Sequence, residues 1–297
     1  MTYFLQLLVT GVAVGSIYAL AALGFVLIYK SSRVINFAHG ELLAIGGFII
    51  YGLSVWLRVP IFLALLIAFV LMYFIGQRIE RVFLRPMIGE PIISVIMVTI
   101  GLASLLDGII YFTPFGTLTA SYPRFLPARP LQFMGLLLRW EHVLGIVLAV
   151  LFVSALWWFF TRTTLGIAMR AVADDQMASL SVGVSIEAVF ALAWAAAAMS
   201  ATAAGFVVGS LYGLELAGLV AIGLRVFPAV ILGGLDSISG AVVGGVIIGI
   251  IEQLASGYLD VYVPGGGTGE VAPFVVLIVI LLLKPHGLFG TAEIERV

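Results

Sequence analysis

The sequence predicts an all-α polytopic membrane protein, and composition, charge spacing and the lack of alternation lead to that class. Of its 297 residues, 63% are hydrophobic and only 10% are charged, and the mean hydropathy is +1.23. A soluble domain carries about 25% charged residues, so this chain cannot cover a surface that faces water. A transmembrane β-barrel would show segments of about 10 residues that alternate between apolar and polar, and none appear here. The charge-free runs approach or exceed the roughly 17–25 residues of a membrane-spanning helix; they are 4–29, 59–77, 91–106, 143–161 and 188–214.

These runs predict about nine membrane crossings, within a range of about eight to ten, in a single transmembrane domain over residues 1–297. The expected crossings lie near 5–29, 37–57, 60–77, 92–114, 141–161, 187–211, 217–234, 238–256 and 271–284. The segment 217–234 contains Arg225 and Pro228, so it is either a full crossing or a broken or re-entrant helix. The last crossing is short unless it continues to Leu288.

The basic residues predict which side of the membrane each loop faces. Nine of the 14 lysines and arginines fall in clusters that the positive-inside rule places in the cytoplasm, and five fall elsewhere. The cytoplasmic clusters are Lys30 with Arg33, Arg78 with Arg81 and Arg85, Arg162 with Arg170, and Lys284 with Arg296. The N-terminus is then outside and the C-terminus inside, with a periplasmic loop at 115–140 and a cytoplasmic loop at 162–185. Three prolines make the outer loop an ordered, non-helical segment; they are Pro123, Pro127 and Pro130.

The predicted cytoplasmic loop contains a short amphipathic helix. Asp175 is a suitable N-cap for a helix that starts at Gln176, and Gly183 suits the left-handed position after its end. So short a helix needs a partner surface, which is either its own bundle or a groove in another protein. Its apolar stripe is made by Met177, Leu180 and Val184.

Four segments in the same order resemble those of one family, the permease subunits of bacterial ABC importers for branched-chain amino acids, of the LivH type. The resemblance covers nearly the whole chain, and its fold implication is the ABC importer permease fold. The segments are INFAHGE (35–41), RAVADDQMASLSVGV (170–184), AVILGGLDSISGAVVGGVIIG (229–249) and KPHGLFG (284–290).

The second segment is similar to the cytoplasmic "EAA" loop by which importer permeases contact their ATPases. Gln176, Met177 and Ala178 stand where Glu-Ala-Ala is usual, so the glutamine and the methionine depart from the pattern. The resemblance implies an ATPase-coupling segment made of Arg170, Asp174, Asp175, Gln176, Met177, Ala178, Leu180 and Gly183.

The resemblance also implies a transport subunit that is not itself an enzyme. No G-x-x-x-x-G-K-[ST] phosphate loop exists, because neither lysine follows a glycine. ATP and Mg²⁺ would bind to two partner ATPase subunits, and no cofactor or metal is expected on this chain. The other implied partners are a second, LivM-like permease in a heterodimer, a periplasmic solute-binding protein and the lipid of the bacterial inner membrane. No nucleic acid is expected.

Glycines predict where helices pack closely. Gly233 and Gly234 are expected to end one helix, and Asp236 or Ser237 to cap the next. Glycine pairs spaced four residues apart let helix backbones approach in lipid, and they serve either plain packing or a sliding surface for gating. These pairs are Gly11 with Gly15, Gly205 with Gly209, Gly240 with Gly244, and Gly245 with Gly249.

The stretch VINFAHGELLAIGGF (34–48) places ionisable side chains inside a very apolar region. On a regular helix, His39 and Glu41 point in nearly opposite directions, so they cannot form an acid–base pair. One interpretation is a segment at the inner membrane surface, with Asn36 as a helix cap and the two ionisable groups partly wet. The other is a broken helix at Asn36 whose N-terminus faces the solute pathway, with a narrow stripe of small or polar residues that leaves room for solute. The stripe consists of Asn36, Gly40, Ala44 and Gly47.

Other ionisable residues also fall in or near the predicted spans. Asp107 lies within the fourth span, where a carboxylate costs roughly 2.5–3.5 kcal/mol and usually faces the bundle interior. Glu187, Glu215 and Glu252 lie near helix ends and are expected to mark interfaces. The predicted pathway candidates are Asn36, His39, Gly40, Glu41, Ala44, Gly47 and Asp107.

The function that the sequence predicts is passage of branched-chain amino acids, or of a similar small polar solute, into the cytoplasm by an ATP-driven importer. Two alternatives stay open. One is a permease of the same family for urea, amides or aromatic acids, and the other is a secondary transporter that uses Asp107 or Glu41 as its ion site. An intramembrane enzyme is disfavoured, because no metal or acid–base constellation lies on one face.

Overall fold

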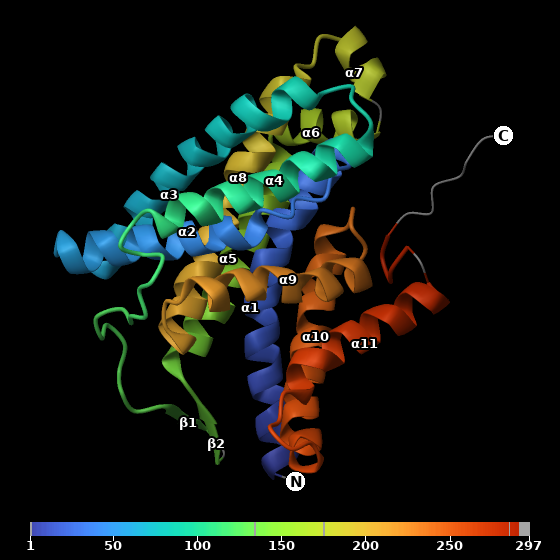
Figure 1. The fold of residues 1–297 in the computed structure, drawn as a ribbon. Coiled ribbons are helices and arrows are strands. Elements are labelled where there is room, and N and C mark those ends of the chain that lie inside the picture. Colours follow the sequence, from blue (N-terminus) through green and yellow to red (C-terminus); the bar gives the residue numbers. More distant parts are fainter. Residues whose placement is uncertain (1, 134, 175, 285, 291–297) are drawn as a thin grey trace.

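The computed structural model describes residues 2–133, 135–174, 176–284 and 286–290, so the predictions for Asp175 and Arg296 fall outside the described residues. The described chain is almost entirely helical (Figure 1). The long helices are α1 (Thr2–Ser32), α2 (His39–Tyr51), α3 (Ile61–Ile79), α4 (Ile92–Tyr111), α5 (Trp140–Arg162), α8 (Ile186–Tyr212), α9 (Leu216–Gly233), α10 (Ile238–Leu259) and α11 (Thr268–Leu283). The short elements are η1 (Gly52–Trp56), η2 (Glu80–Leu84), η3 (Arg85–Met87), β1 (Leu131–Phe133), β2 (Leu136–Leu138), α6 (Thr164–Asp174), α7 (Gln176–Ser181) and η4 (Asp260–Tyr262).

The helix pattern confirms the predicted fold class. Eight helices of the described chain are long and apolar enough to cross a membrane, and α11 is a shorter apolar helix of 16 residues. Helix α9 runs without a break through Pro228, so a broken helix at 217–234 is not what forms. Helix α11 ends at Leu283 and does not continue to Leu288; the backbone N–H of Leu288 instead donates to the carbonyl of Leu232 at 2.8 Å.

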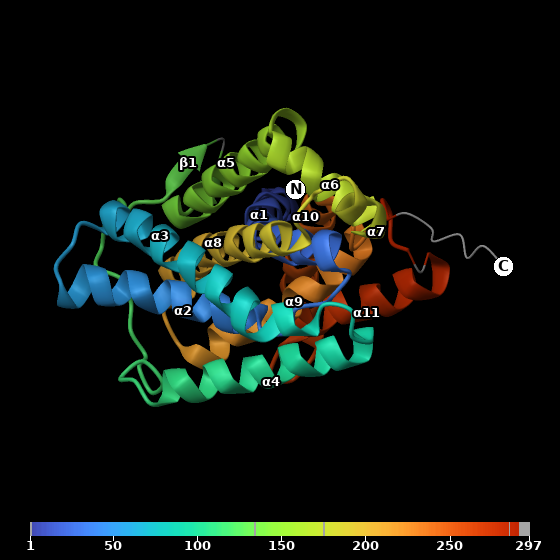
Figure 2. The ribbon, with the colours of Figure 1, turned by 90° about the horizontal axis from the view of Figure 1, so that it is seen from above.

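Helix α1 forms the centre of the molecule, with α8 and α10 beside it (Figures 1 and 2). From Ala13 to Ile28 its side chains are buried on every side, as expected for a helix that is apolar all round. Helices α2, α3 and α4 lie side by side and cross this bundle at a large angle, and α5 covers the opposite side (Figure 2). The outer faces of α3 and α5 expose large apolar side chains, such as Phe74 and Trp157, which suits a surface in contact with lipid.

Glycines form the two seams that hold α10 in place. A Cβ atom at Gly249 would lie 2.3 Å from the backbone nitrogen of Gly15 on α1, and one at Gly245 would lie 2.6 Å from that of Ala19. On another side of α10, a Cβ at Gly244 would lie 2.1 Å from the carbonyl oxygen of Ala229 on α9. Since no larger residue fits at these contacts, α10 is wedged between α1 and α9 by backbone packing.

The turn between α9 and α10 is built as a tight connection. Gly233 ends α9, and Gly234 takes φ +105°, a conformation that favours glycine. The hydroxyl of Ser237 then accepts a hydrogen bond from the backbone N–H of Gly240 at 3.0 Å, which caps α10. Of the two predicted caps, the serine is the one that acts. A Cβ at Gly233 would lie 2.1 Å from the carbonyl oxygen of Gly240, so this pair also belongs to the α9–α10 seam.

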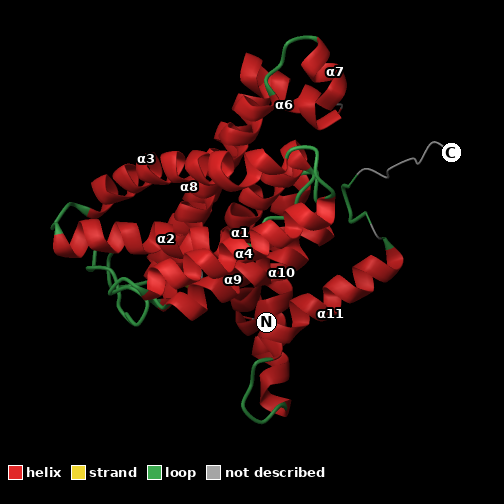
Figure 3. Cartoon of the chain, turned by 45° about the horizontal axis from the view of Figure 1, so that its top comes forward, coloured by secondary structure: helices red, strands yellow, loops and turns green. Residues whose placement is uncertain are grey.

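The hairpin β1–β2 lies at one end of the molecule, and α6 and α7 lie at the other (Figure 1), where they stand away from the remaining helices (Figure 3). The hairpin β1–β2 is fixed to the start of α1, because the side-chain amide of Gln6 donates to the carbonyl of Leu137 at 2.7 Å and accepts from its N–H at 2.8 Å. Ala120 pairs with Leu214 just beyond α8. Burial raises the pKa of Tyr122, whose hydroxyl donates to the carbonyl of Gly47 at 2.9 Å. Helices α6 and α7 project from the other end.

Candidate functional site

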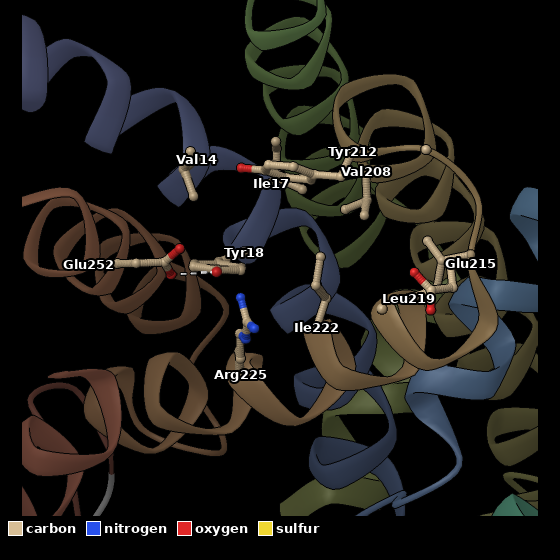
Figure 4. Close-up of a pocket in the computed structure, with 12 residues that line it drawn as sticks. Val14, Ile17, Tyr18, Val208, Tyr212, Glu215, Leu219, Ile222, Arg225 and Glu252 are labelled. Carbon is tan, nitrogen blue, oxygen red and sulfur yellow. Dashed lines mark hydrogen bonds between the residues drawn. The ribbon is translucent and has the colours of Figure 1, made fainter. Parts of the chain in front are cut away.

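A cavity of about 200 Å³ lies between α1, α8, α9 and α10, and we call it the α9 pocket (Figure 4). It lies toward the end of the molecule that carries the hairpin, since Tyr212 and Gly213 at the end of α8 contribute to it. Its lining residues are Val14, Ile17, Tyr18, Val208, Tyr212, Gly213, Glu215, Gly218, Leu219, Ile222, Arg225 and Glu252.

One side of the α9 pocket is polar and charged. The hydroxyl of Tyr18 donates to Oε2 of Glu252 at 2.5 Å, across the α1–α10 contact. The guanidinium of Arg225 extends from α9 toward this pair (Figure 4) and forms an ion pair with Glu270 of α11 at 2.6 Å. Side-chain exposure is 25% for the arginine and 65% for Glu270, so that ion pair lies at the rim.

The rest of the lining is mostly apolar, with Tyr212 and Glu215 as its further polar members. Val14 and Ile17 face the cavity from α1, and Leu219 and Ile222 face it from α9 (Figure 4). Val208 adds to this apolar lining from α8. The cavity therefore offers a positive group, a negative group and an aliphatic surface within one small space.

Helical spacing explains how the sequence builds the pocket. Ile17 and Tyr18 follow Val14 by three and four residues, so all three lie on one face of α1. On α9, Ile222 and Arg225 follow each other at the same spacing. A charged side chain in the hydrocarbon layer costs about 2.5–3.5 kcal/mol on insertion scales unless it faces a cavity or a partner, and the pocket supplies both for Arg225.

Sequence reasoning missed most of this pocket. Tyr18, Tyr212 and Arg225 were not among the predicted pathway residues, and Glu252 was expected to mark a membrane interface. A charged residue in the middle of the apolar segment 217–234 was the available signal. Arg225 belongs to a pocket because Tyr18 and Glu252 lie near it. These two residues are distant in sequence and come together because α1 and α10 pack at the glycine seam.

The predicted pathway residues around Asn36 lie elsewhere, at the break between α1 and α2. Asn36 is buried, and its side-chain oxygen accepts a hydrogen bond from the N–H of Ala38 at 3.0 Å. Helix α2 begins only at His39, so Asn36 is not its N-cap and does not continue its stripe. His39 is 0% exposed and packs on Phe25, with ring centroids 4.3 Å apart, and Glu41 is 5% exposed. The interpretation in which these two groups are partly wet is therefore wrong.

The small stripe on α2 is a packing surface in this conformation. A Cβ atom at Gly40 would lie 2.7 Å from the carbonyl oxygen of Val220 on α9, and Ala44 is fully buried. A Cβ at Gly47 would lie 3.2 Å from the side chain of Leu214. Gly205 meets the other side of α2 at the carbonyl of Leu43. The neighbouring helices fill the space that the stripe was expected to leave for solute.

Helices α2 and α4 each carry one of the predicted acidic pathway residues. Glu41 and Asp107 are close enough to interact electrostatically. Each has one buried carboxylate oxygen without a hydrogen-bond partner among the described residues. Neither belongs to the α9 pocket, and their proposed part in transport stays a prediction.

An aromatic stack lies between the α9 pocket and the end that carries α7. The ring centroids of Phe25 and Phe227 are 4.7 Å apart, and those of Phe227 and Phe37 are 5.3 Å apart. Phe25 follows Tyr18 by seven residues on α1, which is about 10 Å along the helix axis. On α1, the stack with His39 therefore lies about two helical turns beyond Tyr18.

The predicted coupling segment forms a helix at the position expected from the sequence. Helix α7 begins at Gln176, and Gly183 takes φ +85°. Met177 is 74% exposed and Leu180 is 50% exposed, so they do not pack on their own bundle. The preceding α6 turns its own apolar side, which includes Met169 and Val172, into the protein, while Arg170 and Asp174 are exposed.

Comparison with known proteins decides the family. The family described as branched-chain amino acid transport system / permease component matches residues 7–283. The chain belongs to this family. The branched-chain amino acid permease LivH of Escherichia coli K12 is 34% identical, and the alignment covers 99% of this chain and 98% of LivH. BraD of Pseudomonas aeruginosa is 31% identical over the same shares of the two chains. A probable LivH of Methanocaldococcus jannaschii is 27% identical, over 93% of this chain and 89% of that protein.

A solved structure supports the fold of this permease family member independently. PsaBC from Streptococcus pneumoniae in complex with Fab aligns with a TM-score of 0.50 and 13% identity. The alignment covers 96% of this chain and 93% of the PsaBC chain. The family match and this likeness confirm the predicted permease fold.

Proposed function

We propose that this chain is the transmembrane permease subunit of an ATP-driven importer that carries branched-chain amino acids into the bacterial cytoplasm. The observation that carries the proposal is the full-length similarity to permeases named for high-affinity branched-chain amino acid transport. The α9 pocket supports it, because the cavity is small, partly apolar and charged. Urea and the amides lack both the charges and the aliphatic side chain that such a cavity would accommodate.

In this proposal the exposed helix α7 is the contact with the ATPases. Two partner subunits bind ATP and Mg²⁺, and their closure pushes on α6 and α7, which follow α5 and precede α8 in the chain. Helix α8 lines the α9 pocket through Val208, so movement at the α7 end reaches the solute site through one rigid helix. A second, LivM-like permease and a periplasmic solute-binding protein complete the assembly in the inner membrane, with the N-terminus outside and the C-terminus inside.

The aromatic stack gives the proposed cycle a closed state. With Phe25, Phe37 and Phe227 packed together, a solute in the α9 pocket is separated from the α7 end. Tilting of α9 against α1 would part these rings and open the route inward. The polar rim at Arg225 and Glu270 would face the second permease or water rather than lipid.

The function is tested by purification and transport. We expect the tagged chain to co-purify with an ATPase pair, and reconstituted vesicles to take up radiolabelled leucine with ATP after a protonophore has collapsed the proton gradient. Uptake that follows the proton gradient and ignores ATP would establish the secondary-transporter alternative. Uptake of urea or benzoate with no uptake of leucine would replace the solute class.

The coupling role of α7 is tested with a matched pair of leucines at the same end of the molecule. Leu180 on α7 is 50% exposed and Leu165 on α6 is 54% exposed. Leu180→Asp should abolish leucine-stimulated ATP hydrolysis, because it puts a charge into a contact that excludes water, while Leu165→Asp should keep it. Equal activity of the two variants would remove α7 from the coupling contact.

A further inference from the structure

We propose that the α9 pocket binds the transported amino acid as a zwitterion. Arg225 receives the α-carboxylate, Glu252 receives the α-ammonium, and Ile17, Val208 and Ile222 surround the aliphatic side chain. This assignment rests on the proposed function and adds to it the residues that recognise the solute.

The charged groups have unused bonding capacity. A guanidinium has five N–H donors in a planar fork, and the ion pair recorded for Arg225 joins its Nη2 to Glu270 at 2.6 Å. A carboxylate accepts about four hydrogen bonds, and from the side chains that the structure describes Glu252 accepts one, from Tyr18 at 2.5 Å. Both groups therefore have hydrogen-bonding capacity left for a solute.

The position of Glu270 makes the rim ion pair exchangeable. Its side chain is 65% exposed, whereas that of Arg225 is 25% exposed, so the arginine is fixed in the pocket and its partner lies outside. An incoming carboxylate can join or replace Glu270 in the bidentate geometry that guanidinium groups favour. The excess of glutamates over arginines around the cavity disfavours a solute that carries only negative charge.

The size and the wall of the cavity set the solute class. A volume of about 200 Å³ is below the roughly 300–1,000 Å³ of pockets for drug-sized ligands. The apolar side chains that α1, α8 and α9 contribute to the lining match a branched aliphatic side chain. The predicted ligand is therefore a free amino acid such as leucine, whereas leucine stripped of either charged group should bind poorly.

The chain provides its own background for a direct test, because it contains no cysteine. Gly218 lines the pocket, and no atom lies within 4 Å of a Cβ built there, so Gly218→Cys introduces a thiol without a clash. Thr117→Cys is the matched control, because Thr117 is exposed in the segment between α4 and the hairpin and is not part of the pocket lining. Each variant is assembled into the whole transporter in lipid nanodiscs, treated with aminoethyl methanethiosulfonate, and followed by the mass of this chain.

We expect leucine to slow modification at position 218 and to leave modification at position 117 unchanged. Neither 3-methylbutylamine, which lacks the carboxylate, nor 4-methylpentanoate, which lacks the ammonium, should protect at tenfold higher concentration. Equal protection by leucine and 3-methylbutylamine would overturn the role of Arg225. Absence of protection by leucine, in a transporter that still imports it, would overturn the pocket while leaving the proposed function intact. A wild-type transporter that does not import leucine would instead refute the proposed function.

Three glutamine substitutions in the Gly218→Cys background distinguish residues that bind the solute from residues that only maintain the structure of the pocket. Glu252→Gln and Arg225→Gln should each raise the leucine concentration for half-protection by at least about tenfold, since each removes one charge-assisted bond. Glu270→Gln removes the rim ion pair but keeps the arginine, and should leave that concentration within about twofold. If Arg225→Gln fails to assemble, Arg225→Lys keeps the charge, loses the bidentate fork and should still weaken protection. An equal effect of Glu270→Gln and Glu252→Gln would show a structural network instead.

Discussion

Two regions of this permease bury polar side chains inside an apolar bundle, and they do so differently. In the α9 pocket, Tyr18, Glu252 and Arg225 have hydrogen-bond or ion-pair partners and line an open cavity. At the break between α1 and α2, Asn36 and His39 are buried against other side chains, and the space around them is filled. The comparison shows that buried polar residues in an apolar segment can line a cavity or be packed away, and that the space beside them separates the two cases.

The break has its own structural explanation. Arg33 takes φ +57° just after the end of α1, and Asn36 turns the chain by accepting from the N–H of Ala38. The hydroxyl of Thr99 on α4 donates to the carbonyl of Ile35 at 3.2 Å and supports the same turn from outside. These polar groups satisfy a backbone that leaves a helix inside an apolar environment, where unpaired groups are costly.

The largest effect is expected when Gly40 is enlarged, which tests whether the stripe on α2 is a packing surface. Gly40→Leu should remove folded protein from the membrane, because a Cβ there would already lie 2.7 Å from the carbonyl of Val220. The control is Gly101→Leu on α4, where nothing lies within 4 Å of a Cβ, and it should keep normal levels. Size-exclusion profiles of the detergent-solubilised variants measure both. A well-folded Gly40→Leu chain with altered leucine affinity would make the stripe a pathway.

Asn36→Ala should reduce stability without changing solute affinity. It leaves the buried N–H of Ala38 unpaired, at a cost of about 1–3 kcal/mol in the free energy of unfolding. Thermal unfolding in detergent gives the loss, and leucine uptake in vesicles gives KM. A raised KM at unchanged stability would place Asn36 in the solute pathway. The break between α1 and α2 would then not be a purely structural region.

Tyr18→Phe should raise the KM for leucine, while it lowers the free energy of unfolding less than Asn36→Ala does. The variant keeps the ring in the α1 core and removes the hydroxyl that donates to Glu252. A freed carboxylate reorients, so KM for leucine should rise by about three- to tenfold. Leucine uptake at several concentrations measures the change, with Tyr29→Phe on the same helix as the control. Wild-type KM in both variants would argue against the pocket as the solute site.

The smallest effect is expected for Glu41→Gln. The substitution keeps the shape of a side chain that is 5% exposed and outside the α9 pocket, so leucine uptake should stay within about twofold of wild type. Uptake driven by ATP with and without a proton gradient is the measurement. Loss of transport would show that Glu41 and Asp107 form a working site and would revive ion coupling.

The sequence predicted the helices of this protein far better than their contacts. The expected first crossing, 5–29, lies within α1, and the short helix was expected to start at Gln176, where α7 begins. Both depend on local properties, namely the length of an apolar run and the residues at its ends. The pocket was missed because Tyr18 and Glu252 are 234 residues apart and neither is unusual where it stands in the sequence.

The sequence alone was sufficient to predict that this chain crosses a membrane as helices, where its loops fall and which segment forms a short amphipathic helix. The exposure of that helix came from the structure. Hydrophobic length and charge spacing are sufficient for these predictions, since a backbone in lipid must pair within its own helix. The tertiary structure decided which polar residues share a cavity and which are packed away. Which residues share a cavity depends on how closely the glycine seams bring α1, α9 and α10 together. The distance between two helices depends on the side chains of both, so the sequence of one helix does not predict it.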